Sequence, residues 1–383
     1  MPSRPAPQGV LSAAVWKLLG YAPLPAVTAL DRLHHTATII ANLRMPVMRF
    51  TGTHPVTGRS TTVVVAGNAP SVEYFTRHLL GRDFDSVSIG HATVWNLPRL
   101  CTGVYRDATL FVACIDRRLG RLIFRDDCLH VPECIGANLT VPQDGDVTRR
   151  ARHSNRNNIR AIHQNRLSWE TGHSLEDFDH FYHRMYVPYA LARHGDGAMI
   201  RSHARLRIYM RHGGILWVLH DGRRVSGTLF TVAGDTLYLI CRGTGLQREE
   251  TVYRGAINSS YVFGVQYAKQ AGLHRLDLGV CRPSLRDGVL VYKKRWGAAL
   301  HESPRCRHSL VFHWANWNNE IAHFIRQTAP ITRDRNGLGA IAAAAEGSMD
   351  TGELEKELLA PGIRHLRILD GTATPSVSDR ASA

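Results

Sequence analysis

The chain has no long uninterrupted apolar run of the kind that a membrane-spanning helix needs. None of its 383 residues lies in a stretch of roughly 18 uncharged apolar positions, the length required to cross a bilayer. We therefore expect no transmembrane segment. The apolar stretch after Arg4 is interrupted by Lys17 and leads to no small-residue cleavage site, so a secretory signal peptide is not expected either.

Cysteine is sparse and irregularly spaced. The seven cysteines form no C-x-x-C pair and are odd in number. A disulfide framework is therefore not expected, and the reducing cytoplasm is the predicted location. Standard zinc spacings are missing around Cys128, His130 and Cys134 and at His180 and His183, so we expect no metal centre.

Several common catalytic motifs are also missing. The sequence contains no G-x-S-x-G elbow, no P-loop and no G-x-G-x-x-G after a predicted strand. Nothing specific therefore supports a serine hydrolase, an NTPase or a dinucleotide-binding enzyme.

Negative charge is scarce relative to positive charge. Lysine and arginine number 47 against 32 aspartates and glutamates, a formal net charge of +15. This excess favours attraction to polyanions such as RNA, nucleotide-bearing ligands or an anionic membrane face. The alternative is an arginine-rich composition without functional meaning. With 44% hydrophobic and 21% charged residues, the chain is typical of a globular protein with room for two domains.

Apolar periodicity predicts a mixed α/β fold. In the N-terminal half it predicts a helix over 68–80 and strands at 61–66, 108–115 and 121–124. The second half is more regular, and its predicted elements in chain order are a basic helix 148–164, a strand 167–171, helices 175–193 and 202–211, strands 214–220, 223–233 and 236–242, a helix 252–270 and a strand 274–279.

Changes in this pattern suggest four segments. We expect a helical N-terminal extension over 1–45, a weakly patterned α/β unit over 46–147 and a regular α/β unit over 148–330. Residues 331–383 lose apolar periodicity and end in Ser, Thr and Pro, so a mostly disordered tail is expected there, with one helix at 351–360.

The most informative stretch runs from Leu276 to Gly297. An apolar strand ends near Asp277 and leads through a loop over 279–297 to the dense cluster Tyr292-Lys293-Lys294-Arg295-Trp296-Gly297. Cations and aromatic rings at the exit of a strand are typical of a cleft for an anionic or nucleotide-bearing ligand.

A second basic feature lies on the predicted helix at 148–164. Arg149, Arg152, Arg156 and Arg160 follow one another at steps of three and four and form one stripe. Like charges aligned in this way indicate an anionic partner, and the alternative is a solvated helix face.

The order helix, helix, three antiparallel strands, helix, strand resembles the Fem-type (FemAB-like) branch of the GNAT acyltransferase superfamily over about residues 128–312. The stripe at 149–160 looks like the basic RRNIRK helix of that family, and Tyr292 to Gly297 looks like its YKxxWG ending. The resemblance implies a GNAT-like mixed sheet flanked by helices, in two tandem GNAT-like units, of which 46–147 is a degenerate copy.

The resemblance also implies an activity. It implies transfer of an acyl or aminoacyl group from acyl-CoA or an aminoacyl-tRNA to an amine acceptor, in cell-envelope or exopolysaccharide metabolism. The implied partners are the amine-bearing acceptor, tRNA and an anionic membrane surface. The family's Gln/Arg-x-x-Gly-x-Gly/Ala loop holds a pyrophosphate at a helix N-terminus. Arg242-Gly243-Thr244-Gly245 departs from that pattern, which disfavours plain acetyl-CoA and leaves a bulkier donor open.

Candidate roles follow from the resemblance and from residue chemistry. Asp277 orients or deprotonates the acceptor amine, and Tyr292 donates a proton to the leaving group. Donor binding is assigned to Arg242, Gly243, Gly245, Lys293 and Arg295, and substrate contacts to Arg152, Arg156, Arg282 and Trp296.

Each role has a structural alternative. Asp277 binds local amides or Arg282, Tyr292 and Trp296 pack in the core, and the cations form a solvated face. The rival function is a non-catalytic RNA- or membrane-surface-binding protein on the same fold.

Overall fold

The computed structural model describes residues 39–40, 42–124, 128–142, 155–195, 198, 200–245, 251–304, 306–344 and 351–369. They form two compact units. The described residues of unit 1 lie within 138–279 and 295–298, and those of unit 2 lie within 34–137, 280–294 and 299–369. This division differs from the expected boundaries at 147/148 and 330/331, because two later segments join the N-terminal half. Most of the predicted extension over 1–45 lies outside the described residues.

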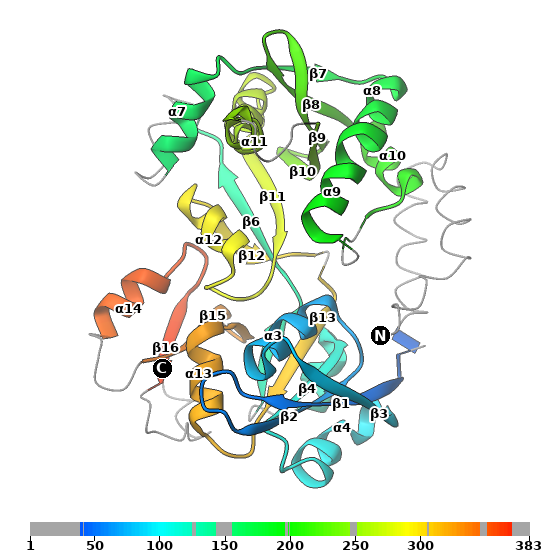
Figure 1. Cartoon of the computed structure of the whole chain (residues 1–383), viewed down its shortest axis with the longest axis vertical. Helices are drawn as coiled ribbons and strands as arrows, with labels where there is room; N and C mark the ends of the chain where they lie inside the picture. The colour runs from blue at the N-terminus through cyan, green and yellow to red at the C-terminus, as the bar shows by residue number, and fades with distance from the viewer. Residues whose placement is uncertain are drawn as a thin grey trace. The chain divides into compact units, whose positions relative to one another are not determined.

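Unit 2 is built on a mixed sheet whose strands, among the described residues, follow the order β3-β1-β2-β4-β13-β5 (Figure 1). Strands β2 and β4 run parallel, and the other neighbours are antiparallel. The elements of this unit are β1 (Arg44–Thr53), β2 (Ser60–Ala66), α3 (Pro70–Leu80), β3 (Phe84–Thr93), η1 (Val94–Asn96), α4 (Leu97–Arg99), η2 (Leu100–Val104), β4 (Leu110–Asp116), α5 (Arg117–Ile123), β5 (Leu129–Pro132), α12 (Gly288–Arg295), β12 (Ala299–Glu302), β13 (His308–His313), α13 (Asn319–Thr328), β14 (Ile331–Asp334), β15 (Gly337–Ala343), α14 (Thr351–Leu358) and β16 (His365–Leu369).

The central strands of this sheet are apolar on both faces because both faces are covered. Val63 and Val65 of β2 pack with α3 and α13, whereas Val64 and Ala66 point the other way, toward η1, α4 and η2. Alternate side chains of a strand lie on opposite faces of a sheet. The continuous apolar run at 63–66 therefore reflects a strand buried on both sides.

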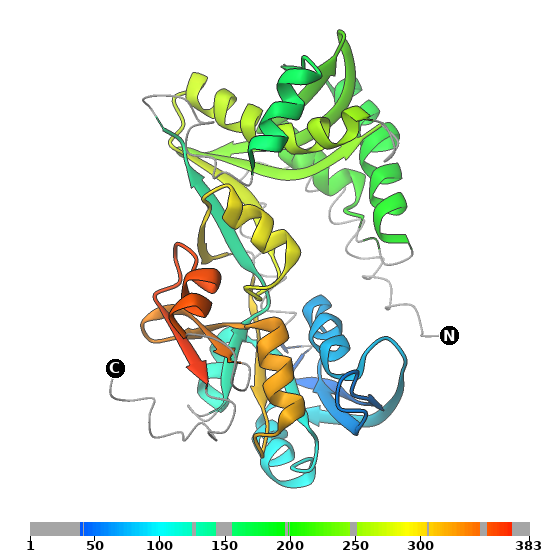
Figure 2. The ribbon, with the colours of Figure 1, turned by 60° about the vertical axis from the view of Figure 1, so that its left-hand side comes forward.

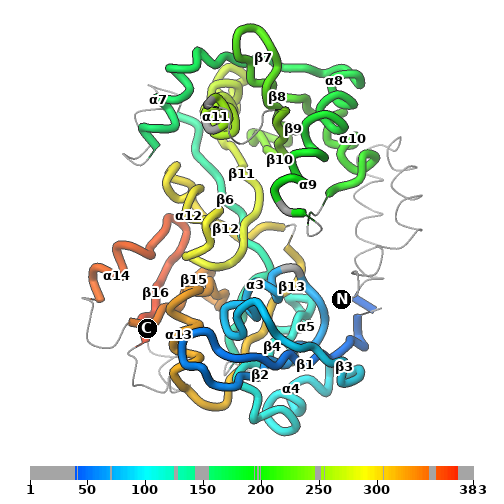
Figure 3. The backbone as a smooth tube through the Cα atoms, in the orientation of Figure 1, coloured from blue at the N-terminus to red at the C-terminus, as the bar shows by residue number. Residues whose placement is uncertain are grey.

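The described residues of the C-terminal part, 331–344 and 351–369, are folded. Strand β13 lies between β4 and β5, so a segment from beyond residue 300 completes the N-terminal sheet (Figure 3). Strands β14, β15 and β16 form a small sheet, and Ile331, Ala340 and Leu354 are buried. The expectation of a mostly disordered tail is wrong, and only its helix at 351–360 is confirmed, as α14. Small residues dominate β15, so its burial leaves little apolar periodicity.

The predicted strand at 121–124 is wrong as well. Residues 117–123 form helix α5, because the side chain of Asp116 accepts hydrogen bonds from the backbone of Arg118 at 2.9 Å and of Leu119 at 3.5 Å. An aspartate in this position caps a helix by satisfying its first amides.

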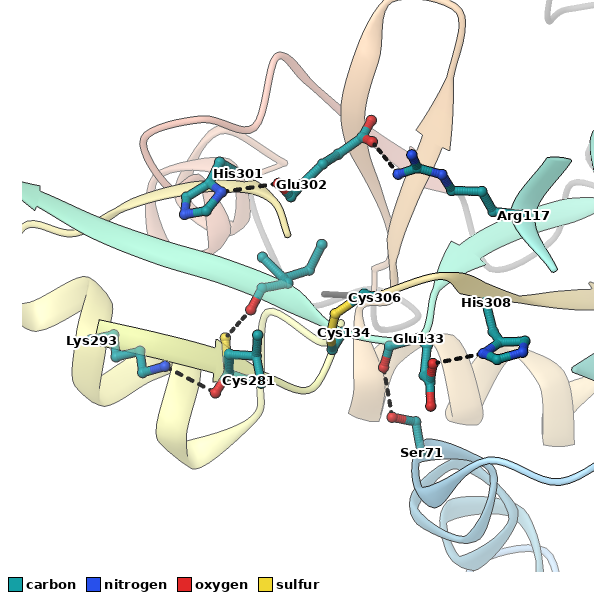
Figure 4. The surroundings of a disulfide bond; sticks show 12 residues. Ser71, Arg117, Glu133, Cys134, Cys281, Lys293, His301, Glu302, Cys306 and His308 are labelled. Atoms are coloured by element: carbon teal, nitrogen blue, oxygen red, sulfur yellow. Dashed lines mark hydrogen bonds and ion pairs between the residues drawn. A yellow bond between two sulfur atoms is a disulfide. The ribbon is translucent and has the colours of Figure 1, made fainter. Parts of the chain in front are cut away.

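One pair of cysteines is joined, in contrast to the sequence expectation. Cys134 and Cys306 form a disulfide, with their Cα atoms 5.6 Å apart (Figure 4). Beside it, Glu133 pairs with His308 at 3.4 Å and accepts a hydrogen bond from the Ser71 hydroxyl through its backbone oxygen. The two cysteines are 172 positions apart. Spacing along the chain gives no sign of this pair, which only the folded sheet brings together.

Unit 1 is built on the larger sheet, in the order β12-β6-β11-β10-β9-β8-β7 among the described residues. Strands β6 and β11 continue from one unit into the other, and β12 belongs to unit 2. The elements are β6 (Ile135–Thr140), α7 (Arg156–Gln164), β7 (Ser168–Gly172), α8 (Leu175–His180), η4 (Phe181–Tyr186), α9 (Val187–His194), α10 (His203–Arg211), β8 (Gly213–His220), β9 (Arg223–Ala233), β10 (Thr236–Thr244), α11 (Thr251–Gln270) and β11 (Arg275–Cys281).

Helices cover both faces of this sheet (Figure 2). Phe178 and Phe181 of the α8–η4 segment pack with Trp217 of β8 in one buried cluster. Helix α11 packs on the sheet, where Gly264 faces Leu239 and Leu276. The predicted fold class, a mixed sheet flanked by helices, is confirmed.

Candidate active site in unit 1

The two parallel strands of unit 1 are paired over only three positions. Thr236, Leu237 and Tyr238 of β10 lie opposite residues 275–277 of β11. Beyond this point β10 continues to Thr244 and is paired with β9 alone among the described strands. The far half of β10 therefore has one edge without a neighbouring strand in the part of the chain that the structure describes. We call this feature the β10–β11 separation.

Irregular backbone accompanies the separation on both strands. In β10 a bulge lies between Leu239 and Cys241, and bulges bend a strand and increase its twist. In β11 Gly279 has φ 76°, a left-handed value that glycine adopts without strain. The Asp277 carboxylate accepts a hydrogen bond from the Gly279 amide at 2.7 Å. One oxygen of half-buried Asp277 therefore stabilises the bend. This contact agrees with the structural alternative for Asp277, in which the carboxylate binds local amides.

A well-anchored arginine reaches the bulge. Arg201 donates from its guanidinium to the carbonyl of Ile240 at 3.1 Å. Its own backbone N–H donates to the Tyr186 hydroxyl, and its carbonyl accepts from the Tyr182 hydroxyl, both at 3.1 Å. Burial raises the pKa of both tyrosines, so both hydroxyls keep their protons at neutral pH. This region therefore offers a fixed cation and neutral phenols.

The cysteine at the bulge is not a nucleophile. Burial raises the pKa of the Cys241 thiol to about 12, although Arg201 lowers it somewhat. The thiolate is the reactive form of cysteine, and at neutral pH almost none is present here. A covalent mechanism through Cys241 is therefore excluded.

A network of side-chain amides joins α7, α11 and the segment 295–298. Asn155 donates to the backbone oxygen of Arg295 at 2.9 Å, and Asn258 of α11 donates to the side-chain oxygen of Asn158 at 2.8 Å. At Gly255 a side chain would lie 3.3 Å from the backbone oxygen of Ala161, so glycine lets α7 and α11 approach closely. The network fixes where α7 begins, with Arg156 exposed in its first turn.

Arg242 lies at the end of this network. Its guanidinium carbon is 5.9 Å from the centre of the Tyr261 ring, and the guanidinium donates to the carbonyl of Ile257 at 3.4 Å. Tyr261 in turn meets Trp296 edge to face, with ring centres 5.9 Å apart. The structure thus brings together Arg242 and Trp296, both predicted from the sequence. Trp296 is buried, so it supports Tyr261 from within the core.

The two predicted donor-binding glycines have different surroundings. A side chain on Gly243 would lie 2.5 Å from the backbone of Met185 and Tyr186, so glycine is required there by packing against η4. Gly245 has no atom within 4 Å of that position and is exposed. Only Gly245 lies on an open surface where a ligand has access.

The remaining predicted residues belong to other parts of the chain. Tyr292, Lys293 and Arg282 lie in unit 2, and the expected loop at 279–297 contains helix α12, which Asp287 caps by accepting backbone hydrogen bonds at 3.0 and 3.1 Å. Lys293 is buried and donates to the carbonyl of Val280 at 3.0 Å (Figure 4). Arg152 lies outside the described residues.

Neither a metal cluster nor a membrane-spanning helix is found in the described ranges. Groups of three or more His, Cys, Asp or Glu side chains suited to a metal ion do not occur there. No helix in the same ranges is long and apolar enough to cross a membrane.

The comparison with solved structures gives matches of low sequence identity and low TM-score. FemX is 12% identical with a TM-score of 0.37, covering 70% of this chain and 88% of that one. L-PGS from Bacillus licheniformis is 10% identical with a TM-score of 0.35, covering 69% and 81%. A GCN5-related N-acetyltransferase from Sphaerobacter thermophilus is 13% identical with a TM-score of 0.29, covering 66% and 72%.

At such identities and TM-scores these similarities carry no conclusion about what the chain does. No protein-family model matches the chain, and no curated protein matches it. What the chain does is therefore inferred from its own residues.

Proposed function

We propose that the chain is an acyltransferase that moves an acyl or aminoacyl group to an amine, with its reaction site at the β10–β11 separation. The observation that supports this proposal is the open edge of β10 beyond Tyr238. Ligands of α/β sheets bind at the carboxyl ends of parallel strands, where neighbouring strands part. An extended donor arm can add to such an edge through backbone hydrogen bonds.

The surroundings of the open edge suit an anionic donor. Arg242 lies on the same strand, and helix α11 follows β10 in the chain. The first amides of a helix and a nearby guanidinium both favour phosphate groups. We propose that acyl-CoA or an aminoacyl-tRNA binds with its phosphates toward Arg242 and Gly245, and that Arg156 and Arg295 extend this positive surface.

The chemistry requires little from side chains. Holding an amine against a thioester or ester carbonyl supplies most of the rate, and backbone N–H groups on the open edge of β10 can stabilise the oxyanion. The amine nitrogen attacks the carbonyl carbon, the bond to sulfur or ribose oxygen breaks, and the amine proton leaves to a base. We propose Asp277 for positioning or deprotonating the amine.

The test is turnover with a panel of acyl-CoAs and aminoacyl-tRNAs against amine acceptors. We expect Asp277→Asn to lower turnover by at least about tenfold with little change in melting temperature, because proton transfer typically contributes about 10²–10⁴ in rate. Any RNA or anionic-vesicle binding by the same preparations is measured in parallel.

Asp235→Asn is the matched control. Asp235 is an exposed carboxylate that pairs with Arg275 at 2.8 Å, next to the start of the same strand pair. The Asp235→Asn variant loses the same negative charge as Asp277→Asn, but the changed side chain lies outside the β10–β11 separation. Equal turnover of the Asp277 and Asp235 variants would contradict the role of Asp277. Tight RNA or vesicle binding without turnover of any donor would favour the rival, a non-catalytic binding protein.

A further inference from the structure

A pocket lies wholly within unit 2. It has a volume of about 420 Å³ and is formed by the outer face of α3, the turn that follows that helix, and Arg282. Small-molecule sites usually measure about 300–1,000 Å³. The pocket is therefore large enough for a small organic ligand. None of its lining residues belongs to the site proposed for acyl transfer in unit 1.

The helix presents one polar face to this pocket. Tyr74, Arg77 and His78 line it together with Gly81 and Arg82 just beyond the helix end. Steps of three and four place these positions on one side of the helix. The opposite side carries Phe75 and Leu79 and is buried in the core of the unit. The fold therefore anchors the polar face rigidly.

Positive charge in the pocket exceeds negative charge. Three arginines line it, and the single lining acid, Glu73, is already paired with Arg77 at 2.5 Å. Arg82 is exposed and makes no ion pair with any residue that the structure describes. Burial and the nearby Arg282 charge both lower the pKa of His78, which indicates a positive field. Like charges held this closely are stabilised by a bound anion.

Arg282 is held in place before any ligand arrives. Its guanidinium carbon lies 4.9 Å from the centre of the Tyr74 ring, and it pairs with the buried Asp287 carboxylate at 3.6 Å. The Tyr74 hydroxyl shares a hydrogen bond with Ser284 at 3.1 Å, and Ser284 also donates to the carbonyl of Thr328. A cation fixed by stacking loses little freedom on binding.

We propose that this pocket binds a small organic molecule that carries a phosphate group. Arginine guanidinium groups match phosphate oxygens with paired hydrogen bonds, and Arg82 and Arg282 supply them. Tyr74 and His78 contribute a partly apolar wall beside the arginines, against which the organic part lies. The volume exceeds what a bare phosphate ion fills, so the ligand is a phosphate ester.

Calorimetric titration of the full chain tests the proposal with inorganic phosphate, a nucleoside monophosphate, a sugar phosphate and a dicarboxylate of matched charge. We expect saturable binding of at least one ester, weaker binding of inorganic phosphate and weaker binding of the dicarboxylate. Arg82→Gln and Arg282→Gln should each weaken ester binding by at least about tenfold, as loss of a charge-assisted hydrogen bond does.

Arg99→Gln is the matched control, because Arg99 is an exposed arginine of unit 2 outside the pocket. Arg82 is exposed too, so its variant folds even if the Arg282 variant does not.

Equal weakening of ester binding by Arg82→Gln and Arg99→Gln, or no saturable binding of any ester, would overturn the site. Equal affinity for the dicarboxylate would overturn the phosphate class, and equal affinity for inorganic phosphate would overturn the ester. If the Arg82→Gln variant loses ester binding but keeps donor-dependent turnover, ester binding in this pocket is distinct from the acyl transfer proposed above.

Discussion

The main sheet of each unit contains a pair of parallel strands, β10–β11 in unit 1 and β2–β4 in unit 2, and the two pairs end differently. In unit 1 the ladder between β10 and β11 covers three positions and then stops. In unit 2 the ladder between β2 and β4 covers four positions, and the other edge of β4 is paired with β13 over residues 111–116. On the edge beyond its last β2 partner, β4 has three residues, 114–116, whereas β10 has six residues beyond its last β11 partner, 239–244.

A single glycine shows how unit 2 stays closed. Just past the end of β2, a side chain on Gly67 would lie 2.7 Å from the backbone oxygen of Cys114. The next residue, Asn68, accepts a hydrogen bond from the Cys114 thiol through its carbonyl. The chain therefore stays against β4 after pairing ends, whereas in unit 1 β11 continues beside β6.

The largest effect is expected from removing the C-terminal segment of unit 2. Truncation after Pro330 deletes the buried side chains of Ile331, Leu338, Leu354 and Leu358. Burying one such side chain stabilises a fold by about 1.5–3 kcal/mol, and a domain has only about 5–15 kcal/mol in all. We expect hydrogen exchange to show loss of protection in β4 and β13.

A shorter truncation provides the control. Removing 370–383 deletes only residues beyond β16, so protection should stay unchanged. Full protection of β4 and β13 after truncation at Pro330 would mean that the fold of unit 2 does not depend on the segment after Pro330. The comparison of the two units would then be wrong on this point.

A smaller effect is expected from forcing unit 2 open. Gly67→Ala adds a side chain that overlaps the Cys114 backbone at a φ of 85°, whereas Gly58→Ala adds one in open space at a φ of 69°. Both carry a left-handed penalty of about 1–2 kcal/mol. Only Gly67→Ala should lose a further ~1–3 kcal/mol from overpacking. Denaturant titration of both variants gives the difference, and equal losses would show that contact with β4 does not close the sheet.

The smallest effect concerns pH and again belongs to unit 2. The rings of His54 and His323 meet edge to face, 4.9 Å apart. Burial lowers the pKa of both, opposed at His54 by Glu320 and reinforced at His323 by His54 and nearby cations. The unfolded chain, whose histidines titrate near 6.5, then binds more protons than the folded one. The neutral His54 and His323 rings therefore contribute fully to the free energy of unfolding above pH 6.5, and this contribution is lost as the pH falls below 6.5.

His308 should behave in the opposite way. Its hydrogen bond with Glu133 raises its pKa, so its contribution is present below 6.5 and is lost as the pH rises through the raised value. Urea midpoints measured across this range should show weaker acid destabilisation in His54→Gln and a smaller loss on the alkaline side in His308→Gln. If the urea midpoints of the wild type and both variants changed with pH in parallel, the pH dependence assigned to His54 and His308 would be refuted.

The element order of unit 1 could be predicted because its signals are local. Strands β8 and β9 are joined at Asp221 and Gly222, whose φ values of 50° and 74° suit a tight hairpin, and α11 is long enough to show its period. Strand β13 and the Cys134–Cys306 pair could not be predicted, because each depends on partners far away in the chain.

The residues proposed for the site also come from local signals. Asp277, Arg242 and Trp296 stand out in short motifs, and the structure places all three in unit 1. The fold assigns Arg282 instead to the pocket on α3. Tyr74, His78 and Arg82 follow one another at steps of four in the sequence, a pattern that by itself is also typical of a solvated helix face. Only the fold brings Arg282 beside them.

The position of β13 in the sheet bears on how the protein is synthesised. Strand β4 leaves the ribosome nearly two hundred residues before β13, and all of the described part of unit 1 between 155 and 279 is made in the interval. Until then β4 has one unpaired edge, and such edges recruit strands from other chains. Chain fragments that stop before residue 308 should therefore expose this edge and aggregate through β4.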